Sequence, residues 1–504
     1  MRVSREQALA LCLADPAAAA DLICELSTGL DRLRADVAAL KAENDTLRTE
    51  CQTLCEAVRH LQEQLAKDSH NSSRPPSADG YAKPAPKSLR KPSGRPPGGQ
   101  QGHQGHTLRR VDHPDHVVTH SVLTCEKCGH SLADRDPDCV ETRQVFDLPE
   151  PRLEVTEHQA QTKTCACGHV NRAPFPENVT APAQYGMRVR SAAVYLRDYQ
   201  LLPSERLTEI MSDLLGAGTF SAGTLANIGS ECFARLAPIA EIIRAQAMAA
   251  PVAGFDETGM RADGALHWLH TVSTESLTWY FAHPRRGTKA MDAAGVLPGF
   301  QGCAVHDFWE SYLNYNCRHA FCNAHLLREL TFLWEQQEQC WASDMIAHLL
   351  GIKDAVDAAK QTGADRLPAA QFDLFQARYF QIVIDGYDQN PLLRKFSGNK
   401  RRGRPKQTKA RNLLDRFREH AGEILAFMYD FSVPFDNNLS ERDLRMAKLK
   451  QKISGTFRGT AGLTAFCRIR SYIATVRKNG LTALDALRRV FEGTPFLSSP
   501  VHQT

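Results

Sequence analysis

The chain has 504 residues, 42% of them hydrophobic and 23% charged, which is enough for about three domains with buried cores. No apolar run approaches the ~18–20 residues that cross a bilayer, and the N-terminus lacks a signal-peptide core, so membrane and secreted classes are disfavoured. Lys and Arg exceed Asp and Glu by only 61 to 57, so net charge alone indicates no nucleic-acid partner. In such a chain the 15 cysteines are expected to be reduced thiols, some of which could bind a metal.

Residues 23–65 carry a heptad repeat. The a positions hold mostly branched residues and one Asn, Asn44, and every d position over six heptads is Leu: Leu26, Leu33, Leu40, Leu47, Leu54 and Leu61. This composition favours a parallel two-stranded coiled coil whose register a buried Asn fixes. A long helix packed on its own protein is the alternative, but the narrow apolar stripe better suits a partner helix. We predict a homodimer through the coiled coil of residues 1-66.

The periodic pattern stops in residues 67-110, where Pro and Gly are too frequent for a packed core. Positions 81–110 hold seven Lys or Arg and no acid, and Arg95 is one of these seven. A flexible basic segment of this kind can lie along a phosphate backbone. We expect DNA contact here, and a solvated spacer is a compatible interpretation.

Two close cysteine pairs follow the basic segment. One is Cys-x-x-Cys and the other Cys-x-Cys, each is followed by Gly, and their thiols belong to Cys125, Cys128, Cys165 and Cys167. Two tight turns with two thiols each can supply the four ligands of a structural Zn²⁺. Three other residues could replace one thiol: His130, His169 and Cys139. The pattern predicts a small zinc-binding domain that serves folding and DNA docking, and unligated cysteines are the alternative.

The region after residue 250 contains short β-rich segments and two carboxylates that each end a predicted strand. The expected order is three strands, a helix and a fourth strand, over residues 252–256, 266–273, 277–281, 289–297 and 302–307. If the first and fourth strands are parallel neighbours, Asp256 and Asp307 lie side by side at one sheet edge. Like charges so close require a cation, and Mg²⁺ or Mn²⁺ prefers such oxygen ligands.

A third acid is expected on a helix that crosses this edge. Residues 436–440 contain several good N-cap residues, and apolar residues beyond them mark the helix. Glu441 would then lie in or near the first turn and face the sheet. Asp436 competes for the role, as a cap or as the ligand itself, and the pattern favours Glu441.

Asp307 and Glu441 are 134 positions apart, so we predict an α-helical insertion at about 318-430 inside the catalytic domain. Cys317, just before this region, and Cys322 and His325 within it could bind a metal, but buried thiols and a hydrogen-bonded histidine are the favoured interpretation.

Two further segments are strongly basic. Residues 400–407 resemble an AT-hook, whose Gly-Arg-Pro core would place Arg402 and Arg404 in an A·T minor groove, with an exposed loop as the alternative. Residues 442–478 hold ten Lys or Arg and one Asp, and the expected DNA contacts are Arg442, Arg445, Lys448, Lys450 and Lys452. Residues 81–110, 394–411 and 442–478 together hold 26 basic residues and one acid, whereas the other 419 positions hold 35 basic and 56 acidic residues. The charge distribution therefore predicts DNA binding.

Four motifs resemble those of the insertion-sequence-sixty-six (TnpC-type) DDE transposases: Asp256-Glu-Thr-Gly, His306-Asp307-Phe-Trp-Glu-Ser-Tyr, Cys322-Asn-Ala-His325-Leu-Leu-Arg328-Glu329 and Asp436-Asn-Asn-Leu-Ser-Glu441-Arg442. The resemblance covers nearly the whole chain, including the leucine-rich helix, the Gly/Pro-rich arm and the Cys-pair domain. It implies an RNase H-like core in which Asp256, Asp307 and Glu441 form the metal-binding triad. It also suggests that His325 and Arg328 share a helix face near the active site.

The expected fold is therefore multidomain α/β: an RNase H-like catalytic core with an α-helical insertion, an N-terminal coiled coil and a small zinc-binding domain. The predicted boundaries are 1-66 for the N-terminal helix and coiled coil, 67-110 for the linker, 111-180 for the zinc-binding domain, 181-250 for a helical DNA-binding or connecting domain, 251-490 for the catalytic domain, and 491-504 for the tail.

The resemblance implies a bacterial DNA transposase in the cytoplasm, associated with the nucleoid. Its chemistry would be strand cleavage and strand transfer with two Mg²⁺ (or Mn²⁺) ions at the ends of an insertion sequence. The expected partners are double-stranded DNA of the element ends and target, a second copy of the chain, and accessory proteins where the element encodes them; no membrane is expected. A catalytically inactive or domesticated DNA-binding regulator and a general RNase H-like nuclease are the alternatives, and the intact triad favours the transposase.

Overall fold

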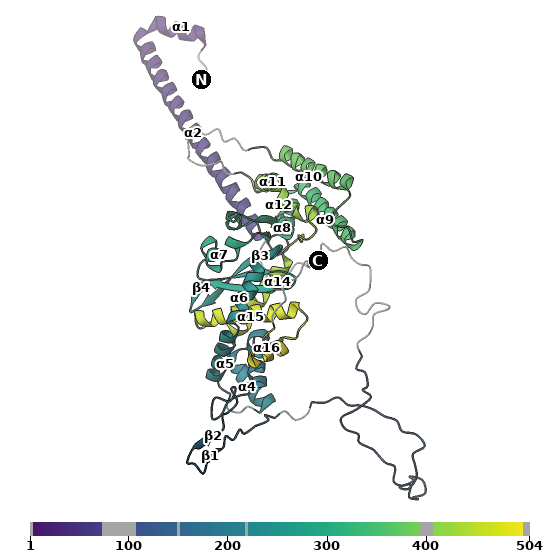
Figure 1. The fold of residues 1–504 in the computed structure, drawn as a ribbon. Coiled ribbons are helices and arrows are strands. Elements are labelled where there is room, and N and C mark those ends of the chain that lie inside the picture. Colours follow the sequence, from purple (N-terminus) through teal and green to yellow (C-terminus); the bar gives the residue numbers. More distant parts are fainter. Residues whose placement is uncertain (1–3, 73–106, 149–151, 217–219, 393–406, 497–504) are drawn as a thin grey trace. The chain divides into compact units, whose positions relative to one another are not determined.

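The computed structural model describes residues 4–72, 107–148, 152–216, 220–392 and 407–496 (Figure 1). Arg95, Arg402 and Arg404 lie outside the described residues. The chain divides into two compact units, one of Met1–Pro86, His325–Ile352 and Asp373–Arg418, the other of Lys87–Ala324, Lys353–Phe372 and Glu419–Thr504. Among the described residues, no helix combines the length and hydropathy that a membrane span requires.

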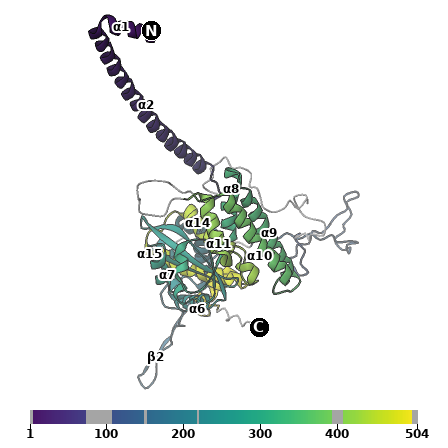
Figure 2. The ribbon, with the colours of Figure 1, turned by 90° about the horizontal axis from the view of Figure 1, so that it is seen from above.

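The first unit begins with two helices, α1 (Arg5–Ala14) and α2 (Pro16–Leu65), which Figure 2 shows meeting at an angle. The side chain of Asp15 accepts hydrogen bonds from the first N–H groups of α2, and Pro16 occupies its first turn, so the start of the long helix is well capped. The predicted long helix is confirmed. Its apolar a and d side chains between Ile23 and Leu61 are 50–66% exposed.

The C-terminal end of α2 packs within its own unit through side chains outside the leucine stripe. Glu63 accepts a hydrogen bond from Gln337 of α8 (Asn323–Gln337) and pairs with Lys409 of α11 (Lys409–Glu419). The ammonium groups of Lys67 and Lys409 both lie over the ring of Phe332, at 5.8 and 5.0 Å from its centre. The helices α9 (Cys340–Gln361) and α10 (Ala369–Gln389) continue the chain after α8.

The second unit is built on a five-stranded sheet in the order β5-β4-β3-β6-β7. Its strands are β3 (Val252–Ala262), β4 (Ala265–Ser273), β5 (Thr278–His283), β6 (Cys303–His306) and β7 (Arg318–Phe321). The first three are antiparallel neighbours, and β3, β6 and β7 pair in parallel. The condition set for the two acids, a parallel pairing of the first and fourth strands, is therefore met.

Side chains alternate between two cores on the two faces of the sheet, as the pleat requires. Phe255 and Trp279 belong to the larger core, together with residues of α6 (Ala237–Met248) and α15 (Thr460–Lys478). Met260 and Ala262 lie on the opposite face, in the core that includes Leu444 of α14 (Asn438–Ser454). Even-numbered positions of β3 thus face α14, and Asp256 is one of them.

Short helices surround this sheet. The predicted helical segment 181-250 contains α3 (Met187–Val194), a π-helical turn (Tyr195–Tyr199), α4 (Ser204–Leu215), α5 (Ala222–Arg235) and α6. The remaining helices and 3₁₀ turns of the described residues are α7 (Thr288–Ala294), η3 (Leu297–Gly299), η4 (Glu310–Asn314), α12 (Ala421–Ile424), α13 (Ala426–Tyr429) and α16 (Ala483–Glu492).

Two predictions about strands were wrong. Asp256 does not end its strand, because β3 continues to Ala262 and pairs with β4 over nine residues, from Gly254 to Ala262. The pairing of β3 with β6, in contrast, stops at Gly254. Residues 318–321, which the sequence assigned to the helical insertion, form β7. This strand is only four residues long, too short for a period to be recognised. The helical part of the insertion therefore begins at Asn323.

Candidate active site and zinc-binding turns

Asp256 and Asp307 meet where the parallel pairing of β3 and β6 ends. Gly254 and Val305 form the last pair between these strands, so Asp256 and Asp307 each lie two residues beyond it, and Asp307 is close enough to act on Asp256 electrostatically. Each carboxylate also has a local hydrogen bond, from the N–H of Glu257 to Asp256 at 2.8 Å and from the N–H of Trp309 to Asp307 at 3.1 Å. The two acids therefore lie close together just beyond the parallel pairing of β3 and β6.

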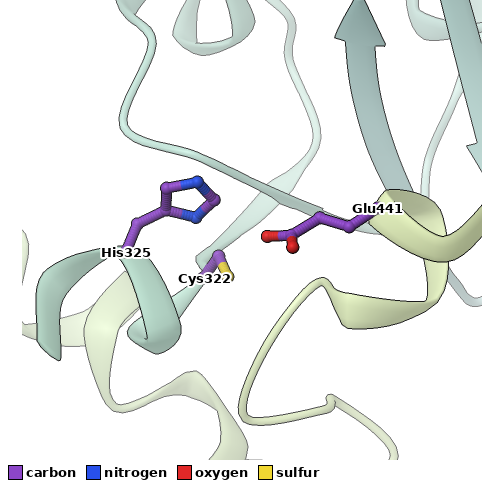
Figure 3. A group of neighbouring side chains, drawn as sticks. All are labelled: Cys322, His325 and Glu441. Atoms are coloured by element: carbon purple, nitrogen blue, oxygen red, sulfur yellow. The ribbon is translucent and has the colours of Figure 1, made fainter. Parts of the chain in front are cut away.

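Glu441 lies in the first turn of α14, as the cap residues predicted. The residue that precedes the helix, Asn437, fixes this turn to the sheet and to the end of β7. Its side-chain amide donates to the carbonyl of Phe255 at 2.8 Å, and its backbone N–H donates to the thiol sulfur of Cys322 at 3.2 Å. Figure 3 shows Cys322 and Glu441, whose thiol sulfur and carboxylate oxygen lie within 4.8 Å of each other. It also shows His325, which lies in the first turn of α8.

Gly254 allows this close approach of α14 to β3. A Cβ atom at position 254 would lie 2.2 Å from Oδ1 of Asn437 and 2.3 Å from Oγ of Ser440. Both neighbours are short side chains in the buried contact, so neither can move away without disturbing it. The absence of a side chain at Gly254, two residues before Asp256, therefore sets the distance between strand and helix.

A second anchor of α14 is Asp443, two residues after Glu441. Its carboxylate accepts hydrogen bonds from the hydroxyls of Ser273 and Thr278, at 2.6 and 2.7 Å, and pairs with Lys478 at 2.9 Å. Its carbonyl oxygen accepts from the hydroxyl of Tyr280. These contacts connect α14 to β4, β5 and α15. This role could not be recognised from the sequence, in which Asp443 is one isolated acid in a basic segment.

The three acids interact electrostatically. Burial raises the pKa of Asp256 well above its ordinary value, and the neighbouring carboxylates of Glu257, Glu441 and Asp307 raise it further. Burial raises the pKa of the Tyr312 hydroxyl, and the carboxylates of Glu257, Asp256 and Asp307 raise it further. A site that disfavours its own negative charge in this way suits a bound cation, and its oxygen donors fit Mg²⁺ or Mn²⁺.

Asp436, the competing acid, has a structural role in this geometry. Its Oδ1 accepts a hydrogen bond from the backbone N–H of Asn438 at 3.0 Å, as a capping carboxylate does at a helix start. The arrangement of the residues therefore favours Glu441 as the third acid.

The basic residues that follow Glu441 separate into two groups. Arg442, Arg445, Lys448 and Lys452 are exposed and, at their helical spacing, form one stripe on α14. The ammonium group of Lys448 donates to the carbonyl of Gly259 at 2.6 Å. Lys450 lies off this stripe, and burial lowers its pKa although Asp198 acts in the opposite direction.

Three other basic residues of segment 442–478 support the fold, contrary to the prediction that this segment as a whole faces DNA. Arg470 is buried and donates to the carbonyl of Asp198, Arg468 stacks on Phe233 at 3.7 Å, and Lys478 pairs with Asp443. The sequence shows their charge but not their burial.

The two cysteine pairs lie in separate tight turns. In the first, the N–H of Cys125 donates to the carbonyl of His130, and Gly129 adopts the left-handed conformation at φ 71°. In the second, Cys165 and Cys167 lie in the loop between β1 (Thr162–Thr164) and β2 (Val170–Arg172), and Gly168 is left-handed at φ 86°.

Hydrogen bonds within these turns favour the thiolate form that zinc binds. Donors from Cys128 and Lys127 lower the pKa of Cys125, and donors from Cys167 lower that of Cys165. Within the described part of the chain, the two pairs are not gathered into one four-thiol cluster. Each pair by itself has the shape and chemistry of half a zinc site.

Three family profiles match the chain. The profile described as "Transposase IS66 family" matches residues 182–465, which is more than half of the chain. The chain belongs to the IS66 transposase family. A second profile, "zinc-finger binding domain of transposase IS66", matches residues 123–168 and so includes all four cysteines of the pairs. A family of unknown function (DUF6444) matches residues 24–109, and no curated protein matches the chain.

These matches confirm the resemblance found in the sequence. Membership of the IS66 family indicates a transposase, and the zinc-finger match indicates a structural zinc ion and DNA binding. The thiolate-favouring turns around Cys125 and Cys165 agree with that zinc ion.

Proposed function

We propose that this IS66-family protein cleaves and transfers DNA strands at the ends of an insertion sequence, with Asp256, Asp307 and Glu441 as its metal ligands. The observation that carries the proposal is the meeting of these three acids, which two parallel strands and the first turn of α14 bring together. We assign the sheet that carries them to an RNase H-like core. Its order of three antiparallel strands followed by two parallel ones supports that assignment.

The acids would hold two Mg²⁺ or Mn²⁺ ions, which supply activation of the attacking oxygen and stabilisation of the leaving oxygen. The chain's own part is to hold the three carboxylates in place before DNA arrives. Asn437 and Asp443 fix α14 to the sheet on either side of Glu441. Such preorganisation lowers the cost of assembling the charged site during the reaction.

The exposed stripe of α14 would bind the DNA backbone next to this site. Arg442, Arg445 and Lys452 follow Glu441 on one helix face, so a duplex that contacts them lies close to the acids. Such phosphate contacts fix the register of the DNA and make its affinity depend on salt. Beyond the described residues, Arg95, Arg402 and Arg404 stay predictions.

The proposed activity is tested with purified protein and a duplex taken from the ends of the element that encodes it. We expect strand cleavage with Mg²⁺ or Mn²⁺, joining of the cleaved ends to target DNA, and loss of both reactions when EDTA removes the divalent ions. DNA binding without any cleavage would identify a DNA-binding regulator instead. Cleavage without joining would identify a nuclease.

We also propose that α2 pairs with the same helix of a second copy. Its leucine stripe is exposed along its length, and the contacts of Glu63 with Gln337 and Lys409 leave Leu61 and Leu65 uncovered. Leu at d with branched residues at a favours a parallel pair. The matched family over residues 24–109 has no stated function, so the heptad pattern itself supports the proposal.

Charges placed in the stripe are expected to separate the dimer. The full-length double variant Leu33→Glu/Leu47→Glu should elute with the mass of one 56.0 kDa chain, whereas the wild type should elute with twice that mass. Light scattering coupled to gel filtration measures both. The control is Ala35→Glu/Ala42→Glu, which places the same charges on the outer face of the helix and should stay dimeric. A wild type that is monomeric at high micromolar concentration would contradict the proposal.

A further inference from the structure

One guanidinium group contacts residues next to two of the three acids. Arg286 follows β5 in the turn before α7, and its Cζ lies 4.7 Å from the ring centre of Trp268 and 4.1 Å from that of Trp309. Two aromatic rings therefore hold the flat guanidinium group in place.

Both neighbours of Arg286 connect it to the acids. Glu257, which accepts hydrogen bonds from Nε and Nη2 of Arg286 at 3.0 and 2.6 Å, follows Asp256 directly in the chain. Trp309 donates its backbone N–H to Asp307. Arg286 is thus connected to Asp256 through Glu257 and to Asp307 through Trp309.

Part of the guanidinium group is not used by these contacts. Glu257 is only 2% exposed and also accepts from the hydroxyl of Tyr312, so one edge of Arg286 neutralises a buried carboxylate. The Arg286 side chain is nevertheless 40% exposed, and among the described residues its Nη1 has no hydrogen-bond partner. A buried ion pair alone requires neither contact with two tryptophan rings nor an edge open to solvent.

We infer that Arg286 binds a backbone phosphate of the DNA strand that flanks the scissile phosphate. A guanidinium group with a free edge suits a phosphodiester, because it can donate two parallel hydrogen bonds to the two non-bridging oxygens. The two tryptophans preorganise this edge, so little side-chain entropy is lost on binding. The inference rests on the proposed function, since it names the part of the DNA substrate that this site holds.

The test compares Arg286→Ala with Arg285→Ala, which removes the adjacent exposed arginine of the same turn. We expect Arg286→Ala to weaken binding of element-end DNA about 10- to 100-fold and to reduce the slope of log K against log salt by roughly one. Arg285→Ala should change neither value by more than about twofold. Arg286→Lys should recover little of the lost DNA affinity, because an ammonium group lacks the flat shape and paired donors of the guanidinium group. An affinity and slope equal to those of the wild type would overturn the inference.

Neutral methylphosphonates placed one at a time near the cleavage position locate the contact. At one phosphate position, the substitution should lower the DNA affinity of the wild type but not that of Arg286→Ala. Equal losses of affinity in both proteins at every position would overturn the inference. Cleavage of an intact end and joining of a pre-cleaved end are measured separately. If Arg286→Ala is defective in cleavage, the phosphate belongs to the element DNA; if it is defective in joining, the phosphate belongs to the target DNA. A variant without a defect in either step overturns the inference.

Misfolding of Arg286→Ala through the uncompensated Glu257 is controlled by a pair of variants. Glu257→Gln keeps the guanidinium group, and Glu257→Gln/Arg286→Ala removes it without leaving a buried charge. Only the double variant should lose DNA affinity, and equal affinities would overturn the inference. Since binding is measured without divalent ions, these outcomes do not depend on whether the wild type cleaves DNA. A wild type without cleavage would instead contradict the proposed function.

Discussion

Replacing any one of Asp256, Asp307 and Glu441 by its amide is expected to lower strand cleavage by at least about 10³-fold. Each amide keeps the shape of the side chain but removes a charge that the divalent ions require. DNA affinity should stay within about twofold, because the phosphate-binding residues are unchanged. Cleavage rates at saturating Mg²⁺, together with binding in its absence, measure the two effects.

Asp436→Asn is the matched control for Glu441→Gln. Its carboxylate caps the backbone N–H of Asn438, so the variant should keep cleavage and lose at most about 1 kcal/mol of stability. An active Glu441→Gln protein with an inactive Asp436→Asn protein would move the third ligand to Asp436. The amide variants of Asp256, Asp307 and Glu441 should have melting temperatures no lower than that of the wild type in metal-free buffer, since each substitution removes a like charge from the cluster.

Replacing Asp443 by Asn is expected to lower the free energy of unfolding by about 3–5 kcal/mol. The side chains of Asp443 and Lys478 are only 15% and 13% exposed, so the substitution leaves a buried ammonium group without its counter-charge. Lys478 would keep its hydrogen bonds to the carbonyls of Thr274 and Leu277, but neither is charged. Cleavage should also fall, because Glu441 lies two residues away on the same turn. Chemical denaturation and cleavage rates test both effects.

The control for Asp443→Asn is Asp213→Asn on the exposed face of α4, which should change stability by less than about 0.5 kcal/mol. A double variant, Asp443→Asn/Lys478→Met, separates the ion pair from simple packing. It should be less destabilised than the sum of the two single variants, because it leaves no unpaired charge. A loss below about 1 kcal/mol for Asp443→Asn would show that the pair does not anchor α14.

The meeting of Asp256 and Asp307 could be predicted because it depends on local signals. A buried strand that reaches a carboxylate is visible in the sequence, and parallel pairing aligns two such strands. The true end of β3 could not be predicted, since it is set by pairing with β4 beyond Asp256. The four residues of β7 likewise carry no period of their own.

The roles of individual charges were harder to predict than their positions. Lys478 and Arg470 look in the sequence like Arg442 and Arg445, and only the packing of α15 against the sheet separates buried from exposed cations. Arg286 was missed for the same reason. Its two tryptophans are 18 residues before it and 23 residues after it, so no spacing rule connects the three.

The close approach at Gly254 has a consequence for variation among related chains. Because Asn437 and Ser440 occupy the space of a Cβ at position 254, these three positions cannot vary independently. A relative with Ala in place of Gly254 should carry smaller residues in place of both Asn437 and Ser440, or have lost the docked helix and its acid. Gly two residues before the first acid, together with Asn four residues before the third, is therefore a signature for recognising related chains in which α14 keeps its docked position.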